Sequence, residues 1–217
     1  MANWWENIQI KKGKGGCGDV TPEQKNNLID HAVSTWEGMG LSDEQIAFGI
    51  GVMGIESGFN PHAKGTTAES VEYGLGQFID DTWKEAVHHY NTRPEHKARQ
   101  EPDINPEKGR DDPDAQIAVM GPWLRKTWDR AGTIPARQRP SGYRFEEIAY
   151  GKWHGGQNKK PDAIGQFLAD PRYNNPNMRD YFILNVDRAR QALRMRKSAS
   201  QPLGSFGVPS VAAPGGQ

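Results

Sequence analysis

The chain has 217 residues, and its 27 Lys and Arg balance its 27 Asp and Glu, so the formal net charge is zero. This balance argues against partners captured by bulk charge, and we expect neither nucleic-acid binding nor attraction to an anionic membrane. Cys17 is the only cysteine, which excludes an intramolecular disulfide and a cysteine-based metal site.

The length fits one compact domain with tails, and we expect a monomer. Residues 1–19 are polar and glycine-rich, which predicts a flexible N-terminal arm. Residues 20–197 form the expected domain. Residues 198–217 turn to Ser, Pro, Gly and Ala and predict a disordered tail or a linker. No apolar run of ~18 residues could cross a bilayer, so we expect no membrane insertion.

Two capping signals predict the first two helices. Residues 21–24 read Thr-Pro-Glu-Gln, a capping box with Pro at the first helical position, and predict a helix to about Glu37. Residues 42–45 repeat the signal and begin a largely apolar helix that ends at Glu56. The pair Asn60-Pro61 stops that helix, because Pro lacks an N–H and disfavours the helical conformation in the residue before it.

The rest of the chain predicts more helices and almost no period-two alternation, so the fold should be mostly α. The segment 91–112 is rich in charge and proline and predicts a long surface loop, which could wall a cleft or be a solvated insertion. The expected helices span residues 81–90, 112–130, 145–153, 162–168 and 178–197.

Glu56 is the leading candidate for chemistry. It lies in the last turn of an apolar helix, where the helix dipole is negative and apolar neighbours exclude water. Both effects favour the protonated carboxyl, which is the form that a general acid needs at neutral pH. The alternative is a surface or capping carboxylate, which describes most glutamates.

Four ordered segments around Glu56 resemble the signature of the soluble lytic transglycosylases, family 23 of the glycoside hydrolases, which also contains the goose-type lysozymes. They are Glu-Ser-Gly-Phe-Asn-Pro-His-Ala at 56–63, Gly-Leu-Gly-Gln-Phe-Ile at 74–79, Asp-Pro-Asp-Ala-Gln-Ile at 112–117, and 148–156. Gln116 stands where the family usually has Asn. The resemblance runs from about Leu41 to Val186, or about two thirds of the chain.

The resemblance implies a lysozyme-like α-helical domain with a small β element near 64–75. It also implies a peptidoglycan lytic transglycosylase with Glu56 as its single acid and base and with no cofactor. Glu56 would protonate the oxygen between N-acetylmuramic acid and N-acetylglucosamine, and the C6 hydroxyl would then close a 1,6-anhydro ring.

The resemblance and the neighbouring residues also nominate the substrate contacts. Gln77 and Ile79 match family positions that line the cleft, and the Gln77 amide offers both a donor and an acceptor to an acetamido group. Tyr150 matches a tyrosine that orients the acid, with a packed core tyrosine as the alternative. Ser57 is more simply a helix-end hydrogen bonder. The candidate substrate-binding residues are Ser57, Gln77, Phe78, Ile79, Tyr150 and Trp153.

Two further kinds of site are weighed against this one. The adjacent His88 and His89 would project in different directions from a helix, so no metal site is expected. A second catalytic carboxylate has no obvious motif, and each nearby acidic residue is more simply a capping or loop residue. The nearby acidic residues are Glu69, Glu72, Asp80 and Asp81.

Two other functions therefore stay open: a goose-type lysozyme that hydrolyses the same bond, and an inactive glycan-binding or structural virion protein. The substrate would lie in the periplasm or cell wall, yet the first residues lack a secretory signal. We expect delivery by a phage holin, virion injection, a secretion system or a signal that has been removed, with a virion or secretion machine as a partner.

Overall fold

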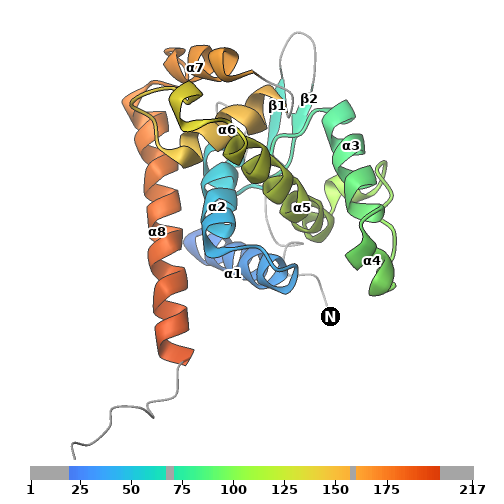
Figure 1. Cartoon of the computed structure of the whole chain (residues 1–217). Helices are drawn as coiled ribbons and strands as arrows, with labels where there is room; N and C mark the ends of the chain where they lie inside the picture. Colours follow the sequence, from blue (N-terminus) through green and yellow to red (C-terminus); the bar gives the residue numbers. More distant parts are fainter. Residues whose placement is uncertain (1–19, 67–70, 157–159, 201–217) are drawn as a thin grey trace, which may run out of the picture.

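The computed structural model describes residues 20–66, 71–156 and 160–200, with the side chains of residues 66, 199 and 200 excepted. Within these residues the protein is mostly helical, with eight α-helices and one small two-stranded sheet (Figure 1). The predicted fold class, mostly α with a small β element near 64–75, is confirmed. The predicted arm at 1–19 and residues 201–217 of the predicted tail lie outside the described residues.

The helices follow the predicted order, with an additional short one between the third and the fifth. Strands β1 and β2 form an antiparallel hairpin in which Lys64 pairs with Tyr73. Two short 3₁₀ helices, η1 and η2, flank α5. The bounds are α1 Pro22–Gly38, α2 Asp43–Ser57, β1 Lys64–Thr66, β2 Val71–Tyr73, α3 Asp80–Asn91, α4 Pro94–Ala98, η1 Gly109–Asp111, α5 Pro113–Gly132, η2 Ala136–Gln138, α6 Phe145–Gly155, α7 Pro161–Ala169 and α8 Pro176–Ser200.

Both predicted capping boxes are present. The side chain of Thr21 accepts a hydrogen bond from the Gln24 backbone, and the Gln24 side chain accepts one from the Thr21 backbone. Ser42 and Gln45 exchange the same pair of bonds at the start of α2. Each box satisfies two backbone N–H groups that the helix leaves without partners. These local bonds fix where α1 and α2 begin.

Helix α2 lies at the centre of the domain, packed against α1, α5 and α8 (Figure 1). Two glycines allow this close approach. A Cβ added at Gly49 would lie 2.6 Å from the Trp36 ring, and one at Gly51 would lie 2.5 Å from Val186. Such distances are impossible for real side chains, so only glycine lets α1 and α8 come this close to α2. Helix α2, whose last turn carries Glu56, is thereby held between its neighbours.

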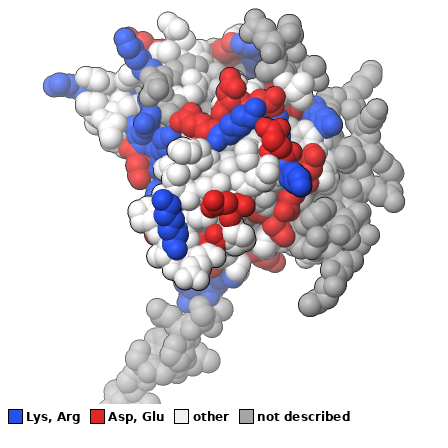
Figure 2. Space-filling view, turned by 90° about the vertical axis from the view of Figure 1, so that its right-hand side faces the viewer, with Lys and Arg blue, Asp and Glu red and all other residues white. Residues whose placement is uncertain are grey.

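The segment 91–112 is more ordered than the loop that was predicted. It contains α4 and η1, and it is tied to α3 by hydrogen bonds from the Trp83 indole to the Pro106 carbonyl and between Asn91 and Ile104. High charge and proline content hid the short helix. Figure 2 shows the side of the molecule that carries α3 and this segment, where Asp and Glu side chains gather with Lys and Arg among them.

The C-terminal boundary also differs from the prediction. Helix α8 continues to Ser200, so residues 198–200 belong to the helix and not to the tail that was expected to begin at Ser198. The composition changes there, but a helix that is already formed extends easily, because each added residue gains one backbone hydrogen bond.

Candidate active site

Glu56 lies in the last turn of α2, as predicted, but the helix stops for a different local reason. Gly58 adopts the left-handed conformation with φ 58°, and its N–H donates to the Gly54 carbonyl. The Phe59 N–H donates to the Met53 carbonyl. This is a glycine-terminated C-cap, and it ends the helix before Pro61 is reached. The chain therefore turns away at Gly58, two residues after Glu56.

The surroundings of Glu56 favour its protonated form. Burial raises the pKa of Glu56 to about 8, the hydrogen bond from Tyr150 works in the opposite direction, and the nearby charge of Glu72 raises the pKa further. Burial dominates because a carboxylate loses the water that stabilises its charge. At neutral pH Glu56 is therefore a carboxylic acid that can donate a proton.

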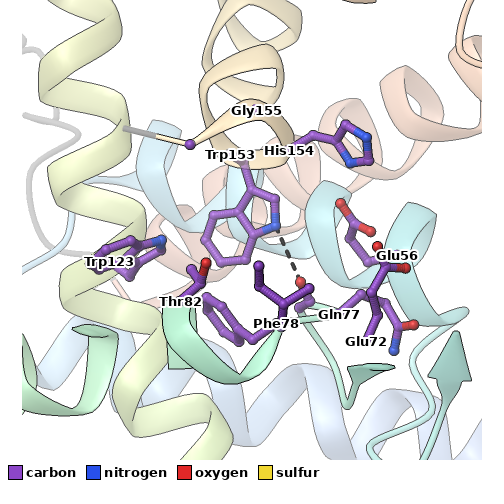
Figure 3. Close-up of a pocket in the computed structure, with 12 residues that line it drawn as sticks. Glu56, Glu72, Gln77, Phe78, Thr82, Trp123, Trp153, His154 and Gly155 are labelled. Atoms are coloured by element: carbon purple, nitrogen blue, oxygen red, sulfur yellow. Dashed lines mark hydrogen bonds between the residues drawn. The ribbon is translucent and has the colours of Figure 1, made fainter. Parts of the chain in front are cut away.

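A cavity of about 370 Å³ opens beside Glu56. Figure 3 shows Glu56, Glu72 and Gln77 at one end of this cavity and Trp123 at the other, with Trp153 between them. Among the described residues its walls carry two carboxylates and no Lys or Arg. The cavity therefore combines a proton donor with aromatic surface, and the volume lies within the range of small-ligand sites.

The segment 74–79 forms one wall of this cavity. The Trp153 indole N–H donates to the Gly76 carbonyl at 3.3 Å, and the rings of Phe78 and Trp153 lie 5.1 Å apart. A Cβ at Gly76 would come within 2.7 Å of the Trp153 ring, so this wall requires glycine. Phe78 is buried in the core and borders the cavity from there. Ile79 is 36% exposed at the cavity edge.

Gln77 reaches the cavity, but its amide is used differently from the prediction. Its Nε2 donates to the carbonyls of Ala63 at 3.1 Å and Gly74 at 2.8 Å, which occupies both N–H groups. Gln77 also has a positive φ of 47°, a conformation that these two bonds hold. Only Oε1 remains to accept a hydrogen bond from a ligand.

Tyr150 is placed against Glu56, as the resemblance implied. Its hydroxyl donates a hydrogen bond to the Glu56 carboxyl, and burial together with that carboxyl raises the pKa of Tyr150 well above the usual value. The ring is also packed in the core, with Phe182 at 5.1 Å and Tyr173 at 5.3 Å. The two interpretations of Tyr150 are thus compatible.

Ser57 is not brought to the cavity. Its side chain is fully buried and its hydroxyl donates to the Met53 carbonyl at 2.9 Å, within the helix. The prediction that Ser57 contacts substrate is therefore not supported, and the helix-end alternative describes it. The other candidate residues, Gln77, Phe78, Ile79 and Trp153, gather around Glu56, with Tyr150 behind the acid.

Gln116 is a supporting residue that the sequence did not identify. Its Oε1 accepts from the Leu75 N–H, and its Nε2 donates to the carbonyls of Pro61 and Arg110, each at 2.8 Å. One amide on α5 thus joins the turn after α2, the cavity wall and η1. In the sequence, the only indication of this role was that Gln116 stands where the lytic transglycosylases usually have Asn, which is also an amide.

Glu72 is the other residue whose role changes. The sequence suggested a loop carboxylate, but β2 places Glu72 in the cavity wall, close enough for its charge to raise the pKa of Glu56. Of the other acidic candidates, Asp80 pairs with Arg110 and Asp81 lies in the first turn of α3. Glu69 lies outside the described residues.

A second cavity, of about 230 Å³, shares Glu56 and His154 with the first. It is lined by the aromatic side chains of Tyr150, Phe167 and Tyr173 and by Arg172. Glu56 therefore borders two adjoining spaces, one lined by tryptophans and the other by tyrosines and a phenylalanine. A long ligand could contact both while its central bond lies at the acid.

No group of three or more His, Cys, Asp and Glu in the described residues is arranged to hold a metal ion. No helix in the described ranges is long and apolar enough to cross a membrane. Comparison with family models, with curated proteins and with solved structures gave no match.

Proposed function

We propose that this protein is a peptidoglycan lytic transglycosylase, in which Glu56 cleaves the bond between N-acetylmuramic acid and N-acetylglucosamine. The observation that carries the proposal is a carboxyl with a pKa of about 8, hydrogen-bonded to Tyr150 and opening into an aromatic cavity. Neutral carboxyls at the edge of a cleft are how glycosidases keep a general acid ready near pH 7.

In this mechanism Glu56 acts twice. It first donates its proton to the glycosidic oxygen, and the C1–O bond of the muramic acid breaks while the 2-acetamido group of the substrate stabilises the positive charge at C1. The Glu56 carboxylate then takes the proton of the C6 hydroxyl, whose oxygen bonds to C1 and closes the 1,6-anhydro ring. Glu56 ends protonated, and no water is consumed. The Tyr150 hydroxyl stabilises the carboxylate between the two steps.

The cavity walls suit a chain of N-acetylated sugars. The indole of Trp153, fixed to Gly76, offers a flat apolar surface for a pyranose ring. The free acceptor of Gln77 could receive the N–H of an acetamido group. Since the cavity presents no Lys or Arg among the described residues, it would bind neutral sugar rings, with charged peptide substituents directed away.

One observation favours a second candidate, hydrolysis by a goose-type lysozyme. Glu72 faces the cavity together with Glu56, and a second carboxylate could activate a water molecule at C1. An inactive glycan-binding protein is less well supported, because binding alone requires no carboxyl with a raised pKa. We also propose that the protein acts at the cell wall, with delivery by a phage holin, a virion, a secretion system or a signal that has been removed.

Mass spectrometry of the products from purified peptidoglycan tests the assignment. Wild-type protein should release muropeptides that end in 1,6-anhydro-N-acetylmuramic acid, each one water lighter than the hydrolysed form. Glu56→Gln should fold and lose about 10² to 10⁴ in rate, since Gln cannot donate the proton. Glu72→Gln, the matched carboxylate in the same cavity, should keep the anhydro product.

Two results would contradict the proposal. Products with only reducing-end N-acetylmuramic acid, lost in Glu72→Gln, would establish hydrolysis with Glu72 as the base. Activity of Glu56→Gln within a few-fold of wild type would remove Glu56 as the acid.

A further inference from the structure

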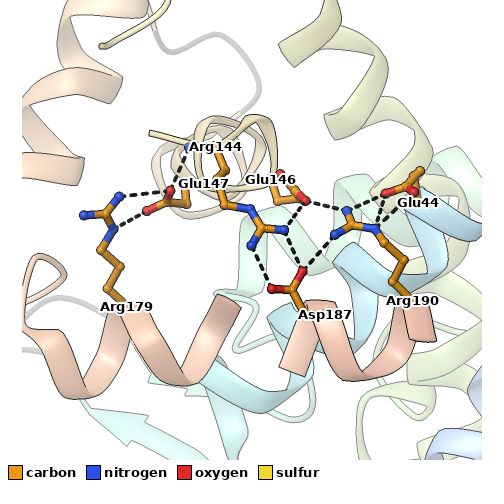
Figure 4. A network of polar contacts seen from close by, with 7 residues as sticks. All are labelled: Glu44, Arg144, Glu146, Glu147, Arg179, Asp187 and Arg190. Atoms are coloured by element: carbon orange, nitrogen blue, oxygen red, sulfur yellow. Dashed lines mark hydrogen bonds and ion pairs between the residues drawn. The ribbon is translucent and has the colours of Figure 1, made fainter. Parts of the chain in front are cut away.

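Two adjacent buried carboxylates, Glu146 and Glu147, lie in the first turn of α6, and the mechanism above uses neither. Glu146 is 6% exposed and Glu147 is fully buried. Consecutive residues project about 100° apart on a helix, so they face different partners. Glu146 contacts Arg144 and Arg190, whereas Glu147 contacts Arg179 (Figure 4).

Glu147 is held by four hydrogen bonds. Its Oε1 accepts from Arg179 Nε at 2.6 Å and from the Tyr173 hydroxyl at 3.4 Å. Its Oε2 accepts from the Arg144 backbone N–H at 2.7 Å and from a second Arg179 nitrogen at 3.3 Å. A buried carboxylate is costly unless it is paired and hydrogen-bonded, so losing any of these bonds is unfavourable. The bonds therefore keep each partner in place around Glu147. The Tyr173 hydroxyl is one of these fixed groups.

A continuous set of contacts leads from Tyr173 to the acid. The Tyr173 and Tyr150 rings lie 5.3 Å apart at an interplanar angle of 32°. Tyr150 follows Glu147 by three residues on α6, so the two lie on the same face of the helix. The Tyr150 hydroxyl in turn donates to Glu56. A chain of direct contacts thus runs from Arg179 on α8 to Glu56 on α2. Its intermediate members are Glu147, Tyr173 and Tyr150.

We propose that Glu147, Arg179 and Tyr173 form a positioning cluster that holds the Tyr150 hydroxyl against the Glu56 carboxyl. The proposal rests on the role of Glu56 proposed above and adds residues that act through Tyr150. The hydrogen bond from Tyr150 stabilises the ionised form of Glu56, so a displaced Tyr150 makes Glu56 a weaker acid. The titratable and charged groups that line the two cavities with Glu56 are Glu72, Tyr150, His154, Asp170, Arg172 and Tyr173.

Direct titration of Glu56 tests this without any assay of activity. Carboxyl ¹³C NMR, with the Glu56 resonance assigned by its absence in Glu56→Gln, gives the ionised fraction at each pH. In Tyr173→Phe and Glu147→Gln we expect that fraction at pH 8 to fall about threefold. Glu146→Gln is the matched control, because it removes ion pairs with Arg144 and Arg190 from the same helix turn but contacts neither tyrosine.

The outcomes separate the two proposals. An unchanged titration of Glu56 in Tyr173→Phe, which keeps the ring and removes only the hydroxyl, overturns the positioning cluster, and so does an equal change in Glu146→Gln. If Glu147→Gln does not fold, Tyr173→Phe alone decides the question. A changed titration in Tyr173→Phe with no cleavage of peptidoglycan by the wild type supports the cluster and refutes the proposed function. In soluble glycan assays, Tyr173→Phe should lower kcat with little change in KM.

Discussion

Replacing Glu56 by Gln should stabilise the protein at neutral pH while removing its activity. The pKa of Glu56 is about 8 in the folded protein against an ordinary 4.5. The folded state therefore holds a proton that the unfolded chain releases between these values. The contribution of Glu56 to stability is fully present below pH 4.5 and is lost as the pH rises to about 8.

The size of the effect follows from the shift. Each pH unit above the ordinary pKa lowers the free energy of unfolding by about 1.4 kcal/mol. At pH 7 the wild-type protein has therefore lost about 3 kcal/mol of stability relative to low pH. Gln is neutral at every pH and loses none. The changed hydrogen bond to Tyr150 costs about 1 kcal/mol. Glu56→Gln should thus be about 2 kcal/mol more stable than wild type at pH 7 and about 1 kcal/mol less stable near pH 4.

Urea unfolding of both proteins at several values between pH 4 and pH 8.5 measures this difference. Tyr150→Phe is the control: it removes the hydrogen bond but keeps the titrating group, so its stability should still fall with rising pH. A difference between wild type and Glu56→Gln that does not change with pH would refute the reasoning. So would a less stable Gln variant at pH 7, since the site would then be one that stabilises an ionised carboxylate.

Three further predictions concern the acid and its supports. Wall cleavage should be steady from about pH 5 to 7, halve near pH 8 and then fall about tenfold per pH step, as Glu56 loses its proton; a pH–rate profile with no loss near pH 8 would contradict this. Gly76→Ala should cost about 1 to 3 kcal/mol and impair substrate use, because its Cβ would meet the Trp153 ring. Gly132→Ala, with nothing within 4 Å of the added Cβ, should be harmless in the same thermal and activity assays. Gln116→Leu should lower the unfolding free energy by about 2 to 4 kcal/mol in urea titrations, because three backbone groups lose their partner; a loss under about 0.5 kcal/mol would contradict that role.

The fold was predictable where its signals are local. The capping boxes at Thr21 and Ser42 involve residues only three apart, so the sequence shows both partners at once. Glu56 was identified as the candidate acid for the same reason, because the apolar helix and the residues that end it are adjacent in the sequence. The short helix α4 was missed because its five residues include a proline and three that titrate, and tertiary contacts stabilise it instead of periodicity.

The supporting residues were hidden because their partners are distant in the chain. Gln116 binds Leu75 and Pro61, which lie 41 and 55 residues away. Glu72 enters the cavity only because the hairpin folds back beside the end of α2. No pattern of spacing reports such contacts. Ser57 shows the converse: it adjoins the acid in sequence, yet the helix directs its hydroxyl inward.

The close packing of α2 has a consequence for motion at the site. With Gly49 and Gly51 in contact with neighbouring helices, the backbone amides of α2 should be among the last to exchange with deuterium, at rates set by global unfolding. The hairpin, with strands of only three residues, should exchange through local opening. We therefore expect the proposed proton donor to lie on a slowly exchanging element and the cavity wall that carries Glu72 to lie on a faster one. Substitutions in residues 71–79 should therefore change which ligands fit the cavity without displacing Glu56.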